Sequence, residues 1–306
     1  MKRYQQTKHA LGSDVILTLV VAGDLQPQEL FDDLWQTIDA FEQRFSRFLT
    51  TSELTRFNHG AGARQQVSAP FHDILLAARQ QASRTDGLYN PLILPALQHA
   101  GYKGSWPTPE AVVKSLDYSE RKTAPWDAIQ IGDTWAEIPE DTALDFGGIG
   151  KGYLLDELGL KLQTLPGYWL SLGGDILCAG TDAVGQQWSV GVQSALQTDQ
   201  SVMTLIVRDA SMAIATSGTT KRKGTSKEGS WHHLIDPRTG KPASTDIATA
   251  TVCTRHATDA DILAKCLVLV GSDQAERFIR DHSIDNALWQ TEDGTLKKVG
   301  TLWSTP

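Results

Sequence analysis

Apolar residues recur at helical spacing through the first third of the chain. The stretch from Pro27 to Phe48 has the pattern of a long amphipathic helix, and Pro27 suits its first turn. Its apolar positions are Leu30, Phe31, Leu34, Ile38, Phe41, Phe45 and Phe48. Ser52 is expected to cap a second, shorter helix. The same periodicity predicts a helix over residues 71–83, and Asn90, which precedes a proline, is expected to be extended.

Past residue 125 the pattern changes to short alternating runs divided by glycine, which is typical of antiparallel strands. Together with an earlier alternating run at 15–22, the predicted strands are 128–131, 135–138, 168–172, 188–192, 202–207 and 248–253. Helices are predicted again at 258–270 and 272–281. Because helices and strands segregate along the chain, the pattern favours an α+β fold over a doubly wound parallel sheet. Residues 101–125, rich in Pro, Gly, Ser and Lys, are expected to form a surface excursion.

Composition narrows the class of protein. The chain has 306 residues, 41% hydrophobic and 21% charged, which is globular and excludes a disordered or collagen-like protein. Its net charge of −8 argues against a nucleic-acid binder. No run approaches the roughly 20 apolar residues of a membrane span, so we expect a cytoplasmic protein unless an export leader has been removed. Three widely spaced cysteines indicate neither a disulfide framework nor a zinc site.

One glycine-rich segment has the chemistry of a phosphate site. Residues 145–153 read DFGGIGKGY and precede an apolar helical pattern. Backbone N–H groups at a helix start, with the cation of Lys151, favour a phosphate. However, Tyr153 stands where a GxGxxG motif needs its last glycine, and no GxxxxGK[ST] motif is present. Taken alone, the segment leaves a structural turn and a phosphate site equally open.

Four further segments are each better explained structurally when taken singly. Residues 172–175 indicate a tight turn at a strand end, and 215–222 a solvated loop of hydroxyls and cations, with phosphate binding as the alternative to the loop. In residues 232–240 the pair Asp236-Pro237 predicts a turn, although the tandem histidines before it are able to accept a proton. Asp259 and Asp261 are expected in a first helical turn, where capping is favoured over a cation site.

Taken in order, these segments resemble those of the bacterial FAD:protein FMN transferase family, also called ApbE, over nearly the whole chain from about Leu11. The matching segments are Leu11-Gly12-Ser13, Ser46-Arg47-Phe48, Ser52-Glu53-Leu54, Phe57-Asn58, Tyr89-Asn90-Pro91, 145–153, 172–175, 215–218 with Arg222, 233–240 and the helix of Asp261. The resemblance implies a T-fold-like α+β architecture of antiparallel sheets with flanking helices. It also implies that residues 1–306 form one catalytic unit.

The activity implied by the resemblance is transfer of FMN from FAD to a threonine or serine hydroxyl of an acceptor flavoprotein, through a phosphodiester bond, with release of AMP. Carried over by position, the FAD contacts are Leu11, Phe48, Leu88, Tyr89, Asn90, Asp145, Lys151 and Ile235. Lys151 would bind the pyrophosphate, and His233 is the candidate base. For Phe48 and Tyr89, packing in the core is the structural alternative.

The family's magnesium site is matched only in part. The resemblance implies ligation by the backbone carbonyl of Gly148, the carboxylate of Asp261 and a hydroxyl one helical turn later, but Lys265 stands at that last position. An ammonium has no lone pair for a metal. Either Lys265 pairs with Asp261 and replaces the metal's charge, or the chain binds FAD without efficient transfer, or a one-residue slip in the helix or a rotamer points the lysine away. A magnesium-dependent FAD pyrophosphatase and a non-catalytic FAD-binding or delivery protein are the alternative functions. Leu11 and Asn90 replace the more usual methionine and aspartate.

Overall fold

The computed structural model describes residues 1–23, 26–102, 123–207, 211–220, 223–226 and 229–305. Most of the predicted surface excursion, and the basic residues Lys221, Arg222 and Lys227, lie outside these ranges. The chain divides into two compact units. The first unit comprises Met1–Ala40, Lys151–Gly218 and Thr245–Pro306, and the second comprises Phe41–Gly150 and Thr219–Ser244.

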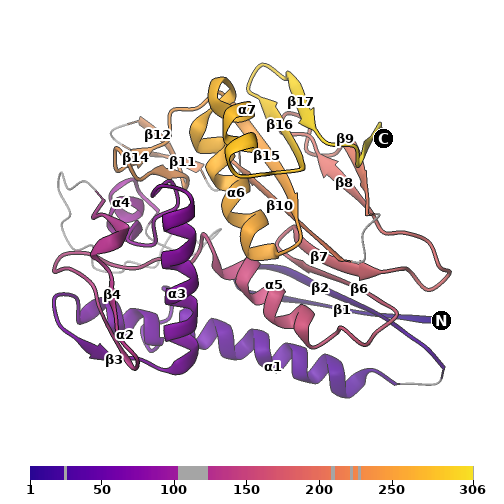
Figure 1. The fold of residues 1–306 in the computed structure, drawn as a ribbon, viewed down its shortest axis with the longest axis horizontal. Helices are drawn as coiled ribbons and strands as arrows, with labels where there is room; N and C mark the ends of the chain where they lie inside the picture. The colour runs from indigo at the N-terminus through magenta and orange to yellow at the C-terminus, as the bar shows by residue number, and fades with distance from the viewer. Residues whose placement is uncertain (24–25, 103–122, 208–210, 221–222, 227–228, 306) are drawn as a thin grey trace. The chain divides into compact units, whose positions relative to one another are not determined.

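An antiparallel sheet of eight strands forms the centre of the first unit, in the order β1-β2-β6-β7-β10-β15-β16-β17. Its strands are β1 (Lys2–Ala10), β2 (Ser13–Val21), β6 (Gly167–Leu172), β7 (Asp175–Gly180), β10 (Ser211–Gly218), β15 (Ile247–Thr254), β16 (Asn286–Thr291) and β17 (Leu296–Val299). Helix α6 (Ala257–Val270) packs on β10 and β15, and α7 (Ser272–Asp281) packs on α6. Figure 1 shows both helices on the same side of the sheet. The antiparallel pairing confirms the α+β prediction.

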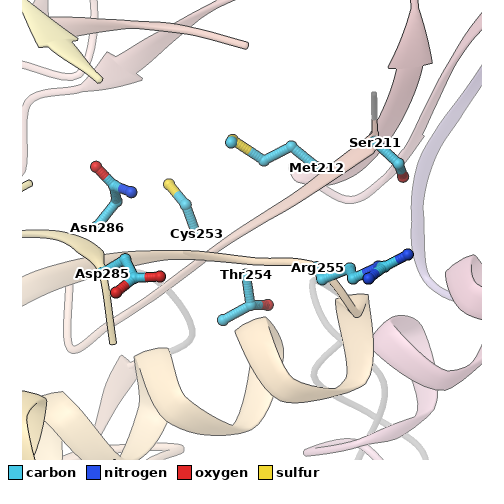
Figure 2. A pocket seen from close by; sticks show the side chains of 7 residues that line it. All are labelled: Ser211, Met212, Cys253, Thr254, Arg255, Asp285 and Asn286. Carbon is cyan, nitrogen blue, oxygen red and sulfur yellow. The ribbon is translucent and has the colours of Figure 1, made fainter. Parts of the chain in front are cut away.

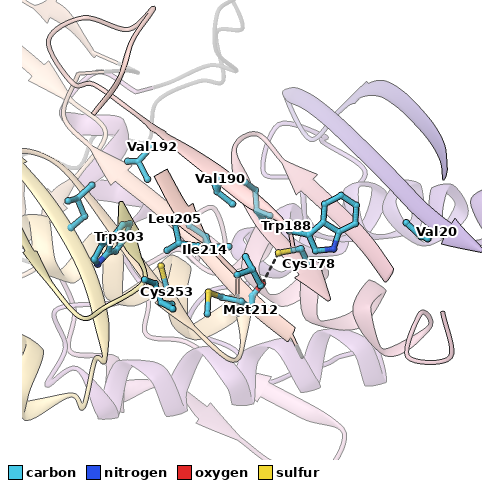
Figure 3. Packing of buried hydrophobic residues seen from close by; sticks show 14 residues of the cluster. Val20, Cys178, Trp188, Val190, Val192, Leu205, Met212, Ile214, Cys253 and Trp303 are labelled. Carbon is cyan, nitrogen blue, oxygen red and sulfur yellow. Dashed lines mark hydrogen bonds between the residues drawn. The ribbon is translucent and has the colours of Figure 1, made fainter. Parts of the chain in front are cut away.

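A smaller sheet supplies a second layer to the first unit. It contains β8 (Ser189–Gln193), β9 (Ser201–Ile206) and β18 (Trp303–Ser304) in the order β18-β9-β8. Buried side chains of both sheets meet in one hydrophobic cluster, where Trp188, Leu205 and Trp303 join Cys178 and Ile214 (Figure 3). Because side chains alternate across a strand, the central sheet buries both of its faces.

Helix α6 begins with its N–H groups held by another helix. The carboxylate of Asp156, on α5 (Gly150–Leu160), accepts bonds from Ala257 N at 2.7 Å and Thr258 N at 2.9 Å. These are donors that a helix start leaves without intrahelical partners. The helix therefore starts at Ala257, and Asp261 falls in its second turn. The prediction that Asp261 lies in the first turn as a capping residue is wrong; only Asp259 lies there.

The second unit is built on an aromatic core. Its elements are the end of α1 (Gln28–Phe45), α2 (Glu53–His59), α3 (Ala69–Arg84), α4 (Leu94–His99), the 3-10 helix η1 (Trp126–Ala128), the sheet of β3 (Gln65–Gln66), β5 (Trp135–Glu137) and β4 (Gln130–Ile131), and the hairpins β11 (Lys223–Ser226) with β12 (Gly229–His232) and β13 (Ile235–Asp236) with β14 (Lys241–Pro242). Phe71 lies 5.7 Å from Phe146 and 5.0 Å from Phe57, measured between ring centroids. Phe146 thereby anchors the glycine-rich segment that follows it.

Three predicted elements differ from the structure. Helix α1 ends at Phe45 and not at Phe48, because Ser46 Oγ accepts a bond from the backbone N–H of Phe48 and replaces the next helical turn. The predicted strand 128–131 keeps only β4, since a 3-10 turn follows Pro125. Residues 215–218 are not a loop: they end strand β10, whose Thr216 hydroxyl bonds that of Thr251 across the sheet at 2.8 Å.

Candidate functional site

One ion pair and one backbone hydrogen bond, both to Asp145, fix the start of the glycine-rich segment in the second unit. Asp145 is buried, and its Oδ1 accepts a bond from Gly147 N at 2.8 Å. Its Oδ2 lies 2.8 Å from Arg47 Nε, and both side chains are 8% exposed. A buried carboxylate needs such a partner to remain charged. Gly148 lies in the turn that this contact holds, two residues before α5 begins.

An aromatic surface lies beside Arg47. The guanidinium carbon of Arg47 is 4.4 Å from the ring centroid of Phe48 and 4.7 Å from that of Tyr102, which is cation–π distance. Phe48 is 38% exposed and therefore does not belong to the core, in which the apolar residues of α1 are buried. The ring of Tyr102 in turn lies 6.4 Å from that of His233. We refer to Arg47, Phe48, Tyr102 and His233 as the aromatic cluster.

The two neighbouring histidines differ in their surroundings. His232 Nε2 lies 3.0 Å from the carbonyl oxygen of Ala243, which binds that ring to the backbone. His233 instead lies in the aromatic cluster. The following turn is held by Asp236, which accepts bonds from Arg238 N at 2.9 Å and from the Arg238 guanidinium at 2.8 Å. The hydrogen bond that the Arg238 guanidinium donates to the Asp236 carboxylate raises the pKa of Arg238.

Three other predicted FAD contacts of the second unit, Tyr89, Asn90 and Ile235, are buried. Tyr89 is 3% exposed, and Ile235 packs against Ala96 and Leu97 in a small hydrophobic cluster. Asn90 is bound on both ends of its amide: Nδ2 donates to the Ala124 carbonyl at 2.8 Å, and Oδ1 accepts from Leu92 N at 2.9 Å. An aspartate has no donor for that carbonyl, so asparagine suits this turn.

In the first unit, Lys151 lies at the predicted glycine turn of residues 172–175, which joins β6 to β7. The Lys151 ammonium pairs with the carboxylate of Asp175, and Asp175 Oδ1 also accepts a bond from Thr216 N at 3.2 Å. Gly173 has φ 61°, and a Cβ there would lie 2.8 Å from Ser13 Oγ. The turn therefore requires glycine at position 173, because its φ is positive and because Ser13 leaves no room for a side chain.

The hairpin turn between β1 and β2 lies at the same place. Leu11 has φ 56° and Gly12 φ 66°, which is the geometry of a type I′ turn. A leucine in this left-handed region is strained, and such strain concentrates at ligand sites. The next residue, Ser13, has a buried Oγ with no hydrogen-bond partner among the described residues. Sequence reasoning gave Ser13 no role.

Asp261 and Lys265 lie together on α6. Lys265 Nζ is 3.7 Å from Asp261 Oδ1, and the two side chains are 18% and 6% exposed. Asp261 Oδ2 accepts a bond from Gly152 N, in the first turn of α5, at 3.4 Å. A Cβ on Gly152 would overlap the carbonyl oxygen of Ala257, so glycine permits this close packing of α5 on α6. Lys265 thus does not point away from Asp261.

A pocket of about 330 Å³ lies at the C-terminal end of strand β15 in the first unit. Its lining is Ser211, Met212, Cys253, Thr254, Arg255, Asp285 and Asn286, and Figure 2 shows Arg255 and Asp285 toward opposite ends of it. None of the predicted site residues lines this pocket. In the described ranges, no group of three or more His, Cys, Asp or Glu side chains could hold a metal ion. No helix in those ranges is long and apolar enough to cross a membrane.

Comparison with known proteins identifies the family. The ApbE family model matches residues 11–288. The chain belongs to the ApbE family. ApbE relatives include the FAD:protein FMN transferase of Salmonella typhimurium, 26% identical over 82% of this chain and 74% of that protein. A second is the FAD:protein FMN transferase of Klebsiella pneumoniae, 24% identical over 95% of this chain and 90% of that protein.

Solved ApbE structures share the fold. The ApbE protein of Thermotoga maritima superposes with a TM-score of 0.85 at 22% identity, covering 97% of each chain. The flavinyl transferase ApbE of Pseudomonas stutzeri, in its apo form, gives 0.81 at 20% identity, covering 99% of this chain and 94% of that one. The expected ApbE architecture is therefore confirmed.

The structure distributes the predicted site residues over both units. Leu11, Lys151 and Asp261 belong to the first unit; Phe48, Leu88, Tyr89, Asn90, Asp145, Gly148, His233 and Ile235 belong to the second. The sequence indicates no role for Arg47, Tyr102 or Asp175. In the structure these side chains contact Asp145, His233 and Lys151, respectively. Arg47 and Asp175 stood within segments already noted, but ion pairs between distant segments leave no periodic signal.

Proposed function

We propose that this chain transfers FMN from FAD to a threonine or serine hydroxyl of an acceptor flavoprotein, with release of AMP. The observation that carries the proposal is the ApbE match over residues 11–288, together with relatives that bear the name FAD:protein FMN transferase. The acceptor oxygen forms a bond to the FMN-side phosphorus, and the bond from that phosphorus to the bridging oxygen breaks. The hydroxyl proton passes to a base, and AMP leaves with the electron pair.

The negative charge of the FAD diphosphate would be neutralised by residues of the first unit. Lys151 stands in the first turn of α5, where N–H groups favour an anion. Its pairing with Asp175 positions the ammonium, and the buried Ser13 hydroxyl has a donor available for a phosphate oxygen. We infer that Leu11 keeps its strained turn because its side chain contacts the flavin nucleotide.

Ring binding and proton transfer would fall to the second unit. Phe48 has an exposed aromatic face suited to a flat heterocycle. Tyr89, Asn90 and Ile235 are buried, so we expect them to shape the site through the backbone of their turns, while Leu88 is partly exposed. Asp145 holds the glycine-rich turn, and His233 is the proposed base because His232 is bound to a carbonyl.

Magnesium, which the family resemblance implies, fits this donor set poorly. The Asp261 carboxylate already accepts a bond from Gly152 N and has the Lys265 ammonium beside it. Magnesium requires near-octahedral oxygen ligands. No step of the proposed reaction is therefore assigned to a metal.

Incubation of the chain with FAD and a candidate acceptor domain tests the activity. Intact-mass spectrometry of the acceptor detects covalent FMN, and chromatography detects AMP. We expect both in equal amounts; AMP without label would indicate a pyrophosphatase instead, and unchanged FAD retained on the protein would indicate a binding protein.

The role of His233 is tested with its neighbour as the matched control. His233→Ala is expected to slow label formation about 10²- to 10⁴-fold, the usual contribution of a general base, with little change in FAD affinity. His232→Ala should slow it much less, because that ring contacts the backbone. Equal losses in the two variants would contradict the assignment.

A further inference from the structure

The buried ion pair on α6 stands where the family resemblance places a divalent cation. Lys265 follows Asp261 by one helical turn, and their side chains lie 3.7 Å apart with little exposure. A lysine at this position brings an ammonium group beside the carboxylate. This charge belongs to the protein and needs no ion from solution.

The pair is fixed beside the start of α5. Asp261 Oδ2 accepts the N–H of Gly152, and the next residue toward the N-terminus is Lys151. The absence of a side chain at Gly152 lets α5 approach the Ala257 carbonyl of α6. The Asp261–Lys265 pair is therefore held at the same helix start that carries the proposed diphosphate contact.

A divalent cation and this ammonium exclude each other. An ammonium donates up to three hydrogen bonds and offers no lone pair, so it repels a cation and attracts phosphate oxygens. Its Nζ also lies within ion-pair distance of the carboxylate oxygen that a metal would need. The described residues offer no cluster of three acidic, histidine or cysteine ligands in compensation.

We propose that Lys265 replaces the divalent cation as the positive charge that faces the diphosphate of FAD, so that this chain binds and cleaves FAD without a metal. The proposal rests on the proposed function. In the transfer step, the negative charge that develops on the departing AMP phosphate is stabilised by the Lys265 ammonium. Asp261 positions that ammonium and takes no part in bond making.

The first test measures cation binding without flavin. Mn²⁺ serves as the probe, because its electron paramagnetic resonance signal falls when the ion is bound. The unmodified chain and Lys265→Met, which removes the charge and adds no oxygen ligand, are expected to leave the signal unchanged. Lys265→Thr, which supplies a hydroxyl, should lower it. Stoichiometric Mn²⁺ binding by the unmodified chain would overturn the proposal.

The second test measures FAD affinity by fluorescence titration, with EDTA and with Mg²⁺. The unmodified chain should bind equally well in both. Lys265→Met should lose about tenfold or more in both, the usual loss for a charged hydrogen bond. Lys265→Thr should lose affinity in EDTA and regain it with Mg²⁺. Loss of FAD affinity by the unmodified chain in EDTA, or full affinity of Lys265→Met, would also overturn it.

These measurements separate this proposal from the proposed function. If no acceptor becomes labelled while the cation and FAD results hold, the transferase assignment fails and the replacement of the metal stands. If FAD does not bind in EDTA or in Mg²⁺, both the proposed function and the role of Lys265 toward FAD fail, and the Mn²⁺ measurement decides only whether a metal site exists. Circular dichroism checks that each variant folds, and the two arms on the unmodified chain need no variant.

Discussion

At the scale of single residues, close packing of α5 on α6 depends on Gly152. Its position in the first turn of α5 is helical, where alanine is ordinarily favoured over glycine by about 0.5–1 kcal/mol. The Ala257 carbonyl oxygen nevertheless occupies the place of a Cβ. Steric overlap with a backbone atom therefore opposes the intrinsic preference, and the two effects differ in sign.

We expect Gly152→Ala to lower the free energy of unfolding by about 1–3 kcal/mol, the usual result of overpacking. Chemical denaturation measures this change. Gly159→Ala in the same helix is the control, since its Cβ would meet chiefly the terminal carbon of Leu177, which is able to move. A stabilised Gly152→Ala would show that the two helices separate at no cost.

Particular residues show how far the sequence predicts the site. The motifs indicate Lys151, Asp145 and Asp261 as candidate site residues without a structure, because glycine turns and helix starts are local features. The partners of these residues, Arg47 and Asp175, come from distant segments, and only the folded chain places them. The orientation of Lys265 toward Asp261 is a choice between side-chain rotamers, which sequence spacing permits but does not decide.

At the scale of elements, hydrophobic periodicity predicts the helices and strands that bury one apolar face. It does not predict strands whose residues are mostly polar and exposed. Strand β1 (Lys2–Ala10) was not predicted, since most of its residues are polar and exposed. It forms because all nine residues pair with β2. The sequence predicts a loop at the hydroxyl-rich end of β10, although residues 213–218 pair with β15 and the Asp175 carboxylate accepts the N–H of Thr216 on the other side.

The start of α7 makes stability depend on pH. Asp246 accepts bonds from the hydroxyl and, at 2.9 Å, from the backbone N–H of Ser272, and these bonds lower the pKa of its carboxyl. A lowered pKa in the folded state stabilises the fold above the ordinary carboxyl pKa. That contribution is lost as the pH falls through the folded pKa.

Asp246→Asn should therefore cost about 0.5–1 kcal/mol at pH 7, a modest value because the carboxylate is exposed. The difference should shrink as the pH falls below the ordinary carboxyl pKa and vanish below the lowered pKa of the folded state. Denaturation at several pH values checks this, with the exposed Asp285→Asn as the control. A difference that stays constant with pH would contradict the assignment.

At the scale of the whole molecule, the cysteines serve packing. All three are free and buried. Burial raises the pKa of Cys178 to about 12 and also raises that of Cys253. The thiolate is the reactive form, so both thiols should be inert near neutral pH. Ellman's reagent is expected to titrate none of the three in the native protein within minutes and all three in denaturant. Rapid reaction of one thiol before unfolding would contradict this.

That residues 1–306 act as one catalytic unit stays a prediction, because the family match covers most of the chain but does not test whether its two units act together.

The central sheet of the first unit is open and has two outer strands, β1 and β17. Exposed backbone on such strands can recruit strands of other molecules. Lys2, Arg3 and Lys8 on β1, and Lys297 and Lys298 on β17, oppose this by charge repulsion. The same polar residues that concealed β1 from sequence reasoning thus protect the sheet from aggregation.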